Sequence, residues 1–241
     1  MRAVRIIMIW CLFSTAAFAQ KKMHILVITG GHGFKQAPFY QMFDSLDNIS
    51  YDKLEQPKAN ELIAGEGVAR YDALVFYDMY NTITEQQKQA YMQLLQKGKA
   101  MIFLHHSLVS YQDWDEFQRI IGGKYYEKAT VLDGDTLKST YQHDVNILVK
   151  IENRQHPVTK GIKDFEIFDE VYGKFGTLPS IKPLLSTTHP GSSRYIAWTN
   201  PYGRTDVLFI QLGHGPEAFA NPNFRKLLQQ GISWSVQQHK K

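Results

Sequence analysis

Short apolar segments of strand length alternate with helical patterns along this sequence, and this alternation constrains the fold more than any other feature. The first strand-like runs lie at residues 23–29, 72–78 and 100–104. Apolar side chains recur at helical spacing between them, at residues 37–46 and 84–96. Thr84 and Gln87 form a capping-box pattern at the start of the second helix, and Gly98 follows its end. Strands that alternate with amphipathic helices indicate an α/β fold with a doubly wound, mostly parallel sheet.

The pattern changes between about residues 122 and 206, where shorter alternating segments such as 145–151 and 195–198 lie among turn residues. We interpret this part as an antiparallel excursion added to the sheet. The α/β pattern returns with a strand at 207–212 and a helix at about 222–236, with Asn221 as its N-cap and Pro222 in its first turn. Because no linker or repeat interrupts the chain, we predict one domain over residues 20–241.

The first nineteen residues have the layout of a cleavable secretory signal. Arg2 and Arg5 precede an apolar run at residues 6–13, and residues 17–19 read Ala-Phe-Ala, a signal-peptidase pattern. The run is shorter than the roughly 20 apolar residues that a membrane-spanning helix needs. A lipoprotein would use Cys11, but Trp10 stands before it where a small residue is expected. We predict cleavage after Ala19 and a periplasmic or secreted protein.

Composition then limits the possible partners and chemistry. Cys11 is the only cysteine, so the mature chain would have no disulfide, no thiolate nucleophile and no cysteine-bound metal. The formal charge of +4 falls to +2 without Arg2 and Arg5, and the other basic residues are dispersed. Nucleic acid is therefore not an expected partner. No second apolar stretch approaches membrane length, so we expect no membrane contact after signal cleavage; the oligomeric state stays open.

Histidines gather where the predicted strands end. In an open parallel sheet the ligand crevice lies outside the carboxyl ends of the strands. Three of four such ends carry histidine, although the chain has only nine. The polar residues at these ends are His32, Asp78, Tyr80, His105, His106 and His214. Imidazoles that converge on one crevice suit proton transfer or metal binding. Any one of these histidines, taken alone, is equally well explained as a hydrogen-bonded loop residue.

An ordered set of motifs resembles the landmarks of the ThuA-like (trehalose-utilisation) family. The motifs are GGHGF at 30–34, FLHHS at 103–107, GGKY at 122–125, HPVTKG at 156–161, DEVY at 169–172 and QLGHG at 211–215. The resemblance covers residues 23–234 and implies a flavodoxin-like fold of the class I glutamine amidotransferase-like superfamily. In those amidotransferases the central strand ends at a catalytic cysteine, and the matching position here is His105. An imidazole cannot form the thioester intermediate, so glutamine hydrolysis by that route is excluded. Ser107 could replace the cysteine as nucleophile, with His106 or His214 as its base. The sequence around Ser107, however, does not have the G-x-S-x-G pattern of a serine elbow.

The resemblance also implies a role in the metabolism of trehalose, related disaccharides or their 3-keto derivatives. Aromatic rings suit the apolar faces of sugars, and polar groups suit their hydroxyls. The substrate-binding candidates are His106, Asp78, Tyr80, Tyr125 and Tyr172, with Tyr111 and Trp114 as further aromatic residues near the predicted crevice. Burial in the core is the alternative for each aromatic side chain.

Glu170 follows an alternating run at residues 165–168, from which its carboxylate could reach the histidines. A solvated acidic turn is the alternative. The catalytic candidates are His105, His214, Glu170 and His32. In this hypothesis His105 and His214 flank a keto-sugar as base and acid, Glu170 orients them or exchanges protons, and His32 closes the crevice. Metal candidates are His32, His105, His106 and His214, with zinc as the expected ion, but no compact metal-ligand motif is present.

Three interpretations of the function therefore remain open from the sequence. The preferred one is a carbohydrate-active protein that uses His/Glu acid–base chemistry on a small glycoside or keto-sugar. The alternatives are a non-catalytic sugar-binding protein and a zinc-dependent hydrolase. Whether the reaction would be a lyase, hydrolase or isomerase step is also open.

Overall fold

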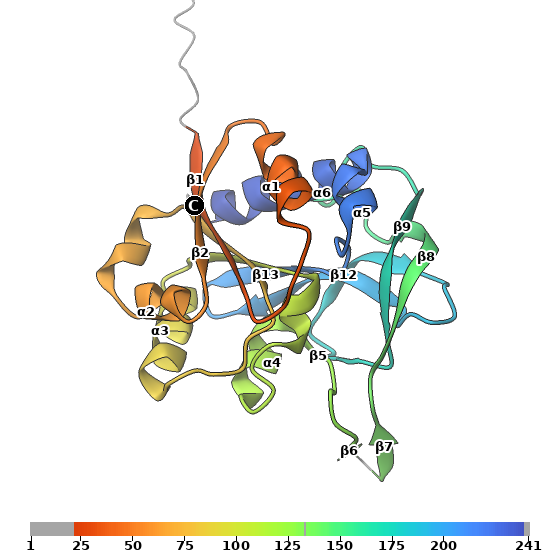
Figure 1. The fold of residues 1–241 in the computed structure, drawn as a ribbon, viewed down its shortest axis with the longest axis horizontal. Coiled ribbons are helices and arrows are strands. Elements are labelled where there is room, and N and C mark those ends of the chain that lie inside the picture. Colours follow the sequence, from red (N-terminus) through yellow and green to blue (C-terminus); the bar gives the residue numbers. More distant parts are fainter. Residues whose placement is uncertain (1–21, 133, 239–241) are drawn as a thin grey trace, which may run out of the picture.

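A computed structural model describes residues 22–132 and 134–238, so the signal sequence predicted at residues 1–19 lies outside the described residues. One nine-stranded sheet organises this part of the chain (Figure 1). Its strands, in spatial order, are β2 (Ile49–Glu55), β1 (Met23–Gly30), β3 (Ala73–Asp78), β4 (Ala100–Leu104), β13 (Thr205–Ile210), β12 (Tyr195–Tyr202), β11 (Lys182–Thr187), β8 (Thr140–Ile151) and β9 (Phe165–Gly173). Two small two-stranded sheets pair β5 (Gly123–Lys124) with β10 (Gly176–Thr177), and β6 (Thr130–Leu132) with β7 (Asp135–Leu137).

The first five strands in this order are parallel to one another. From β13 to β9, each strand is antiparallel to the strand beside it. The order β2-β1-β3-β4-β13 is that of flavodoxin-like folds, in which ligands bind where the strand order reverses. The prediction of a doubly wound α/β sheet with an antiparallel excursion is confirmed.

Helices cover both faces of the sheet because successive strand residues point to opposite sides. Ile25 and Val27 of β1 pack on one face with α1 (Gln36–Asp44), α5 (Pro216–Ala220) and α6 (Pro222–Gln237). Leu26 and Ile28 pack on the other with α2 (Lys58–Ile63), α3 (Glu85–Gln96) and α4 (Asp115–Ile121). The 3₁₀ segments η1 (Glu66–Arg70) and η2 (His105–Val109) complete the connections. None of the described helices is both long and apolar enough to span a membrane.

The helix boundary signals in the sequence are confirmed. The hydroxyl of Thr84 accepts a hydrogen bond from the backbone of Gln87, whose side chain accepts one from the backbone of Thr84, so the capping box begins α3. The Asn221 side chain accepts from the backbone N–H groups of Asn223 and Phe224 and caps α6. Residues 49–55, 58–63 and 115–121, for which we predicted no element, form β2, α2 and α4.

The antiparallel end of the sheet curls back over the parallel part. Four strand intervals separate β13 from β9, which is about 19 Å in a flat sheet. Yet the carboxylate of Asp169 on β9 accepts a hydrogen bond of 2.7 Å from the backbone of Gly213, just beyond β13. Figure 1 shows β8 and β9 standing across the direction of β12 and β13. Because β9 has returned to the direction of β13, its carboxyl end lies at the same edge as the ends of the parallel strands.

Candidate functional site

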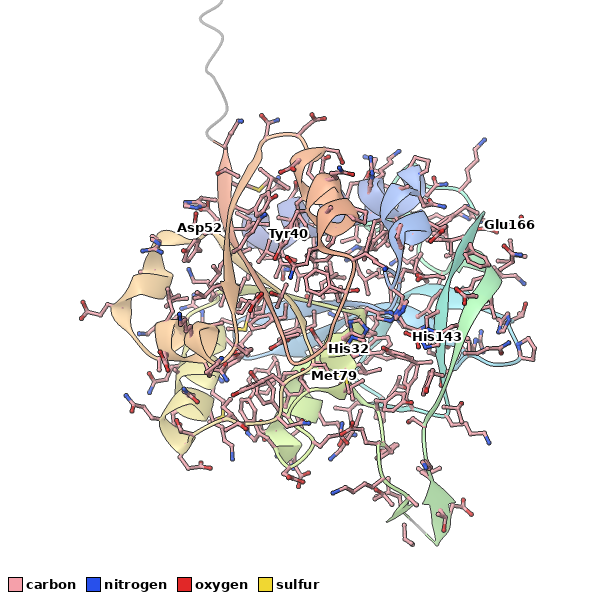
Figure 2. The ribbon with its side chains drawn as sticks, in the orientation of Figure 1. His32, Tyr40, Asp52, Met79, His143 and Glu166 are labelled. Carbon is pink, nitrogen blue, oxygen red and sulfur yellow. The ribbon has the colours of Figure 1, made fainter. Side chains whose placement is uncertain are left out.

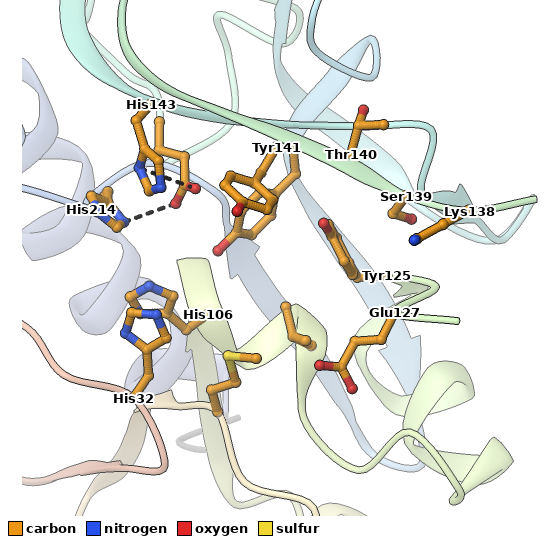
Figure 3. A pocket seen from close by; sticks show the side chains of 14 residues that line it. His32, His106, Tyr125, Glu127, Lys138, Ser139, Thr140, Tyr141, His143 and His214 are labelled. Carbon is orange, nitrogen blue, oxygen red and sulfur yellow. Dashed lines mark ion pairs between the residues drawn. The ribbon is translucent and has the colours of Figure 1, made fainter. Parts of the chain in front are cut away.

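A cavity of about 540 Å³ opens at the carboxyl edge of the sheet. Its lining includes residues that follow β1, β3, β4 and β13: His32, Met79, His106 and His214. Glu170 and Tyr172 of β9 also line the cavity, and the rest of its wall is formed by Tyr125, Glu127, Lys138, Ser139, Thr140, Tyr141 and His143. Figure 2 shows His32, Met79 and His143 converging on the middle of the molecule from different elements, and Figure 3 shows the cavity itself. The volume lies within the range of about 300–1,000 Å³ that is usual for small-molecule sites.

His105 begins the 3₁₀ turn after β4 and lies behind the cavity. Its φ of 41° is in the left-handed region, a strained conformation for a residue with a side chain. The imidazole is fully buried, and its Nδ1 is hydrogen-bonded to the carbonyl oxygen of Gln211. Since a carbonyl only accepts, Nδ1 carries the proton and Nε2 faces Glu170. The strained turn lies directly after β4, one of the central parallel strands of the sheet.

Glu170 is the centre of the polar cluster. Its Oε2 lies 2.7 Å from Nε2 of His105 and 2.8 Å from Nδ1 of His214, and its Oε1 lies 3.3 Å from Nδ1 of His143. Burial alone would raise the pKa of Glu170, but the hydrogen bonds from His105 and His214 outweigh it and hold the pKa well below its usual range. The hydrogen bond to Glu170 in turn raises the pKa of His214, against the opposing effect of burial. The carboxylate is therefore charged at neutral pH.

Asp169 holds the loop that carries His214. Its two carboxylate oxygens accept hydrogen bonds from the backbone N–H groups of Gly213, at 2.7 Å, and of His214, at 2.8 Å. Gly213 has a φ of 108°, and a Cβ at this position would lie 2.7 Å from the ring of Phe224. Adjacent carboxylates on β9 thus have separate tasks: Asp169 fixes the backbone of the loop, and Glu170 contacts its imidazole.

His106 and His32 form the other side of the cluster. Their rings stack with centroids 4.2 Å apart, with His106 buried and His32 exposed at the rim. Within the described part of the chain, neither ring nitrogen of His106 has a hydrogen-bond partner. Burial and the neighbouring histidines hold the pKa of His106 well below its ordinary value, so this imidazole is neutral. His32 donates from Nδ1 to the carbonyl oxygen of Gly33, 2.6 Å away.

The structure brings most, though not all, of the candidate residues together. His105, His106, His214 and Glu170 form one cluster, with His32 stacked against it and Tyr125 and Tyr172 in the cavity wall. Tyr80 is absent from the lining and packs against the core beside α3. Asp78 is buried beneath the site, where it accepts hydrogen bonds from Gln56 and Ser107. Tyr111 and Trp114 are core residues.

Several lining residues come from the antiparallel excursion and were not identified from the sequence. They are Glu127, Lys138, Ser139, Thr140, Tyr141 and His143. The ring centroid of His143 lies 4.8 Å from that of His214. The strand-end rule that finds His32, His105 and His214 does not apply to β8, because β8 is antiparallel to its neighbours and His143 lies within it. The alternating pattern of this segment was the one signal that could have found it.

Comparisons with known proteins agree with this architecture. The structure resembles a protein from Parabacteroides merdae described as ThuA-like, with 20% identity, a TM-score of 0.73 and 90% of each chain covered. It also resembles a protein from Bacteroides uniformis described as ThuA-like, with 18% identity and a TM-score of 0.68 over 92% of this chain and 95% of that one. At sequence identities this low, the similarity shows that the proteins share a fold.

A more distant likeness is to a Thermoplasma acidophilum protein described as a component of GMP synthase. The identity is 8%, the TM-score is 0.57, and 92% of this chain and 98% of that one are covered. This likeness supports an amidotransferase-like fold. No curated protein matches the sequence. A sequence model of the ThuA family, described as trehalose utilisation, matches residues 24–235, so the chain belongs to the ThuA family.

Proposed function

We propose that this ThuA-family protein is an exported enzyme that acts on a small glycoside or keto-sugar through proton transfer by its histidine–glutamate cluster. The observation that carries the proposal is the carboxylate of Glu170, held between His105 and His214 at the floor of the cavity. A buried carboxylate paired with imidazoles is the arrangement by which proteins hold a proton acceptor in place.

The cavity wall supports a sugar as the ligand. Tyr125 and Tyr172 pack edge to face with ring centroids 5.1 Å apart, and the exposed ring of Tyr141 also lines the cavity. Such rings offer apolar faces for a pyranose ring and hydroxyls for its polar edge. Lys138 and Glu127 lie toward the end of the cavity away from the histidines (Figure 3). The family's description as trehalose-utilisation proteins agrees with a sugar-sized ligand.

The different exposure of the two histidines supports different roles for them. The His214 side chain is 29% exposed, whereas that of His105 is fully buried and has both nitrogens engaged. His214 is therefore the imidazole that contacts substrate, and His105 is a positioning residue that holds Glu170 from behind. With Nδ1–H directed at Glu170, the Nε2 lone pair of His214 is free to accept a proton. His32, stacked on His106 at the rim, closes the cavity.

The reaction that fits these roles is removal of a proton from the carbon next to a ketone. The C–H bond breaks, its proton passes to Nε2 of His214, and its electron pair moves into an enolate whose charge rests on the ketone oxygen. Glu170 stabilises the imidazolium that forms. The enolate then regains a proton, which returns or isomerises the sugar, or it expels the group on the next carbon, which cleaves a glycoside.

The test is turnover of trehalose, related disaccharides and their 3-keto derivatives by the wild type and by matched variants. Glu170→Gln keeps the shape but removes the charge, and His214→Asn removes the base. We expect each to lower kcat by about 10²–10⁴-fold, the usual contribution of a general base. His24→Asn, which changes a histidine on β1 outside the cluster, is the control and should keep full activity.

Two results would contradict the proposal. One is tight sugar binding without any turnover, which would identify a binding protein instead. The other is turnover by Glu170→Gln and His214→Asn at the wild-type rate, which would place the chemistry elsewhere.

A further inference from the structure

The polar cluster at the cavity floor has the donor set of a metal centre. His105, His106, Glu170 and His214 each present one nitrogen or oxygen atom, and these four atoms lie within 4.8 Å of one another. Three of them are closer still: Nε2 of His105 lies 3.3 Å from Nδ1 of His214, and both contact Oε2 of Glu170. Ligand atoms on a tetrahedral zinc ion lie about 3.3 Å apart. For all four atoms to coordinate one ion, the side chains must move by distances on the order of an ångström.

The hydrogen bond behind His105 orients this imidazole as a ligand. Its Nδ1–H points at the carbonyl oxygen of Gln211, which fixes the tautomer and leaves the Nε2 lone pair directed at the cluster. Metal-binding histidines almost always make such a bond from their second nitrogen. Without an ion, Nε2 needs a second proton to contact Glu170 favourably. Nε2 of His105 and Nδ1 of His214, which lie 3.3 Å apart, would then both donate to the same oxygen, Oε2 of Glu170.

His106 supplies an independent observation. It is buried, and neither of its ring nitrogens has a hydrogen-bond partner within the described part of the chain. A buried polar group without a hydrogen-bond partner destabilises the folded protein. Its ring centroid is 4.5 Å from that of His105 and 5.4 Å from that of His214. A shared cation is a partner that would satisfy one of these nitrogens.

The local charge also suits a divalent ion. Glu170 and the adjacent buried Asp169 bring two carboxylates to the cluster, and no lysine or arginine pairs with either among the described residues. Three neutral imidazoles and one carboxylate are ligands that zinc and similar transition metals prefer over calcium or magnesium.

From these observations we propose that the cavity floor binds one zinc-class divalent cation through His105 Nε2, His214 Nδ1, Glu170 and a nitrogen of His106. The proposal rests on the proposed function in taking this cavity as the active site, and it revises one role there, because the proton acceptor becomes His143 instead of His214. The bound cation faces the cavity, where it can polarise a ketone oxygen of the substrate. It makes His214 a ligand, and His143, 3.3 Å from Oε1 of Glu170, becomes the imidazole that is free to accept a proton.

The experiment measures metal binding rather than turnover, so its failure is distinguishable from failure of the proposed function. Protein without a histidine tag is stripped with chelator and titrated with Zn²⁺ by calorimetry, with elemental analysis of the dialysed product. We expect one equivalent of zinc. Loss of a residue that only hydrogen-bonds a metal ligand costs about 10–100-fold in affinity, so loss of a ligand in Glu170→Gln or His106→Gln should cost at least that. His24→Asn, outside the cluster, should bind as the wild type does.

A second measurement uses the wild type alone, in case a variant fails to fold. Co²⁺ in a four- or five-coordinate nitrogen–oxygen site gives visible absorption bands much stronger than those of the hydrated ion. We expect such bands at one equivalent of Co²⁺ and their loss when one equivalent of Zn²⁺ displaces it. A spectrum of hydrated Co²⁺, the absence of stoichiometric zinc, or affinity unchanged in both ligand variants would overturn the proposal.

Discussion

Single residues in this protein carry charge in places where burial makes charge costly. Glu170 offsets that cost with two imidazoles, and Asp169 offsets it with two backbone N–H groups. The side-chain hydrogen bonds that the structure describes for Asp78 come from neutral groups, the amide of Gln56 and the hydroxyl of Ser107. Burial therefore raises the pKa of Asp78 to about 6, with the two hydrogen bonds opposing the rise.

The raised pKa of Asp78 predicts a pH-dependent stability. Because the folded pKa lies above the ordinary value of 3.8, the native state holds the proton more tightly than the unfolded state does. The contribution of Asp78 to the free energy of unfolding should be highest below about pH 4 and should fall by about 3 kcal/mol as pH rises through about 6. Denaturant unfolding of the wild type and Asp78→Asn between pH 4 and 7 checks this. Parallel curves for the two proteins would contradict it.

How far the site could be predicted depends on which residues obey a local rule. His32, His105, His106 and His214 follow parallel strands, so strand position alone places them at one edge. His143 obeys no such rule, because it reaches the cavity only through the curl of β8 and β9. Tyr80 and Asp78 also follow a strand, but Tyr80 packs against the core and Asp78 turns into a buried network with Gln56. Side-chain direction after a strand depends on tertiary packing that the sequence pattern does not report.

At the level of elements, the loop between β1 and α1 depends on close backbone approach. Gly31 has a φ of 81°, and a Cβ there would lie 1.8 Å from the carbonyl oxygen of Met79. No atom lies within 4 Å of a Cβ at Gly33. The same loop therefore contains one glycine that the fold requires and one that it does not.

This contrast predicts different costs for the same substitution. Gly31→Ala should lower the free energy of unfolding by about 2–5 kcal/mol, because backbone strain adds to the overlap with Met79. It should also weaken sugar binding, since His32 is the next residue. Gly33→Ala is the matched control and should stay within about 0.5 kcal/mol of the wild type. Equal stability of the two variants in thermal or denaturant unfolding would refute this explanation of the loop.

The elements themselves were predictable where the sequence carries a strong local signal. The buried strands β1, β3 and β4 and the capped helices α3 and α6 are of this kind. Strand β2 was missed because it lies at the sheet edge, where Ile49 is its only buried residue, so the strand shows little apolar periodicity. The curl of β8 and β9 was not predictable, because it arises from contacts between residues such as Asp169 and Gly213, far apart in the chain.

At the level of the whole molecule, the sequence predicts export and loss of the first nineteen residues. Expression of the full chain in a bacterium should therefore yield a periplasmic or secreted protein whose first residue is Gln20. Intact-mass measurement of the purified protein checks the cleavage site, and fractionation checks the compartment. A chain that retains Met1 in the cytoplasm would contradict the prediction. The catalytic proposal would be unaffected, since it depends only on described residues.

The whole fold also determines which side chains surround the turn after β4. The turn after β4 keeps a strained backbone at His105, where the amidotransferase-like resemblance places the nucleophile, but presents an imidazole. The curled strands bring Glu170 over that turn and enclose the cavity. This arrangement is the basis of our proposal that the site transfers protons.

The most direct test of proton transfer at this site is exchange of substrate hydrogen with solvent. A 3-keto glycoside is incubated with the protein in D₂O, and NMR follows deuterium entering the carbon next to the ketone. We expect enzyme-dependent exchange that Glu170→Gln slows by about 100-fold or more, whichever product forms later. Exchange no faster than in buffer, or equally fast with Glu170→Gln, would contradict the proposed chemistry.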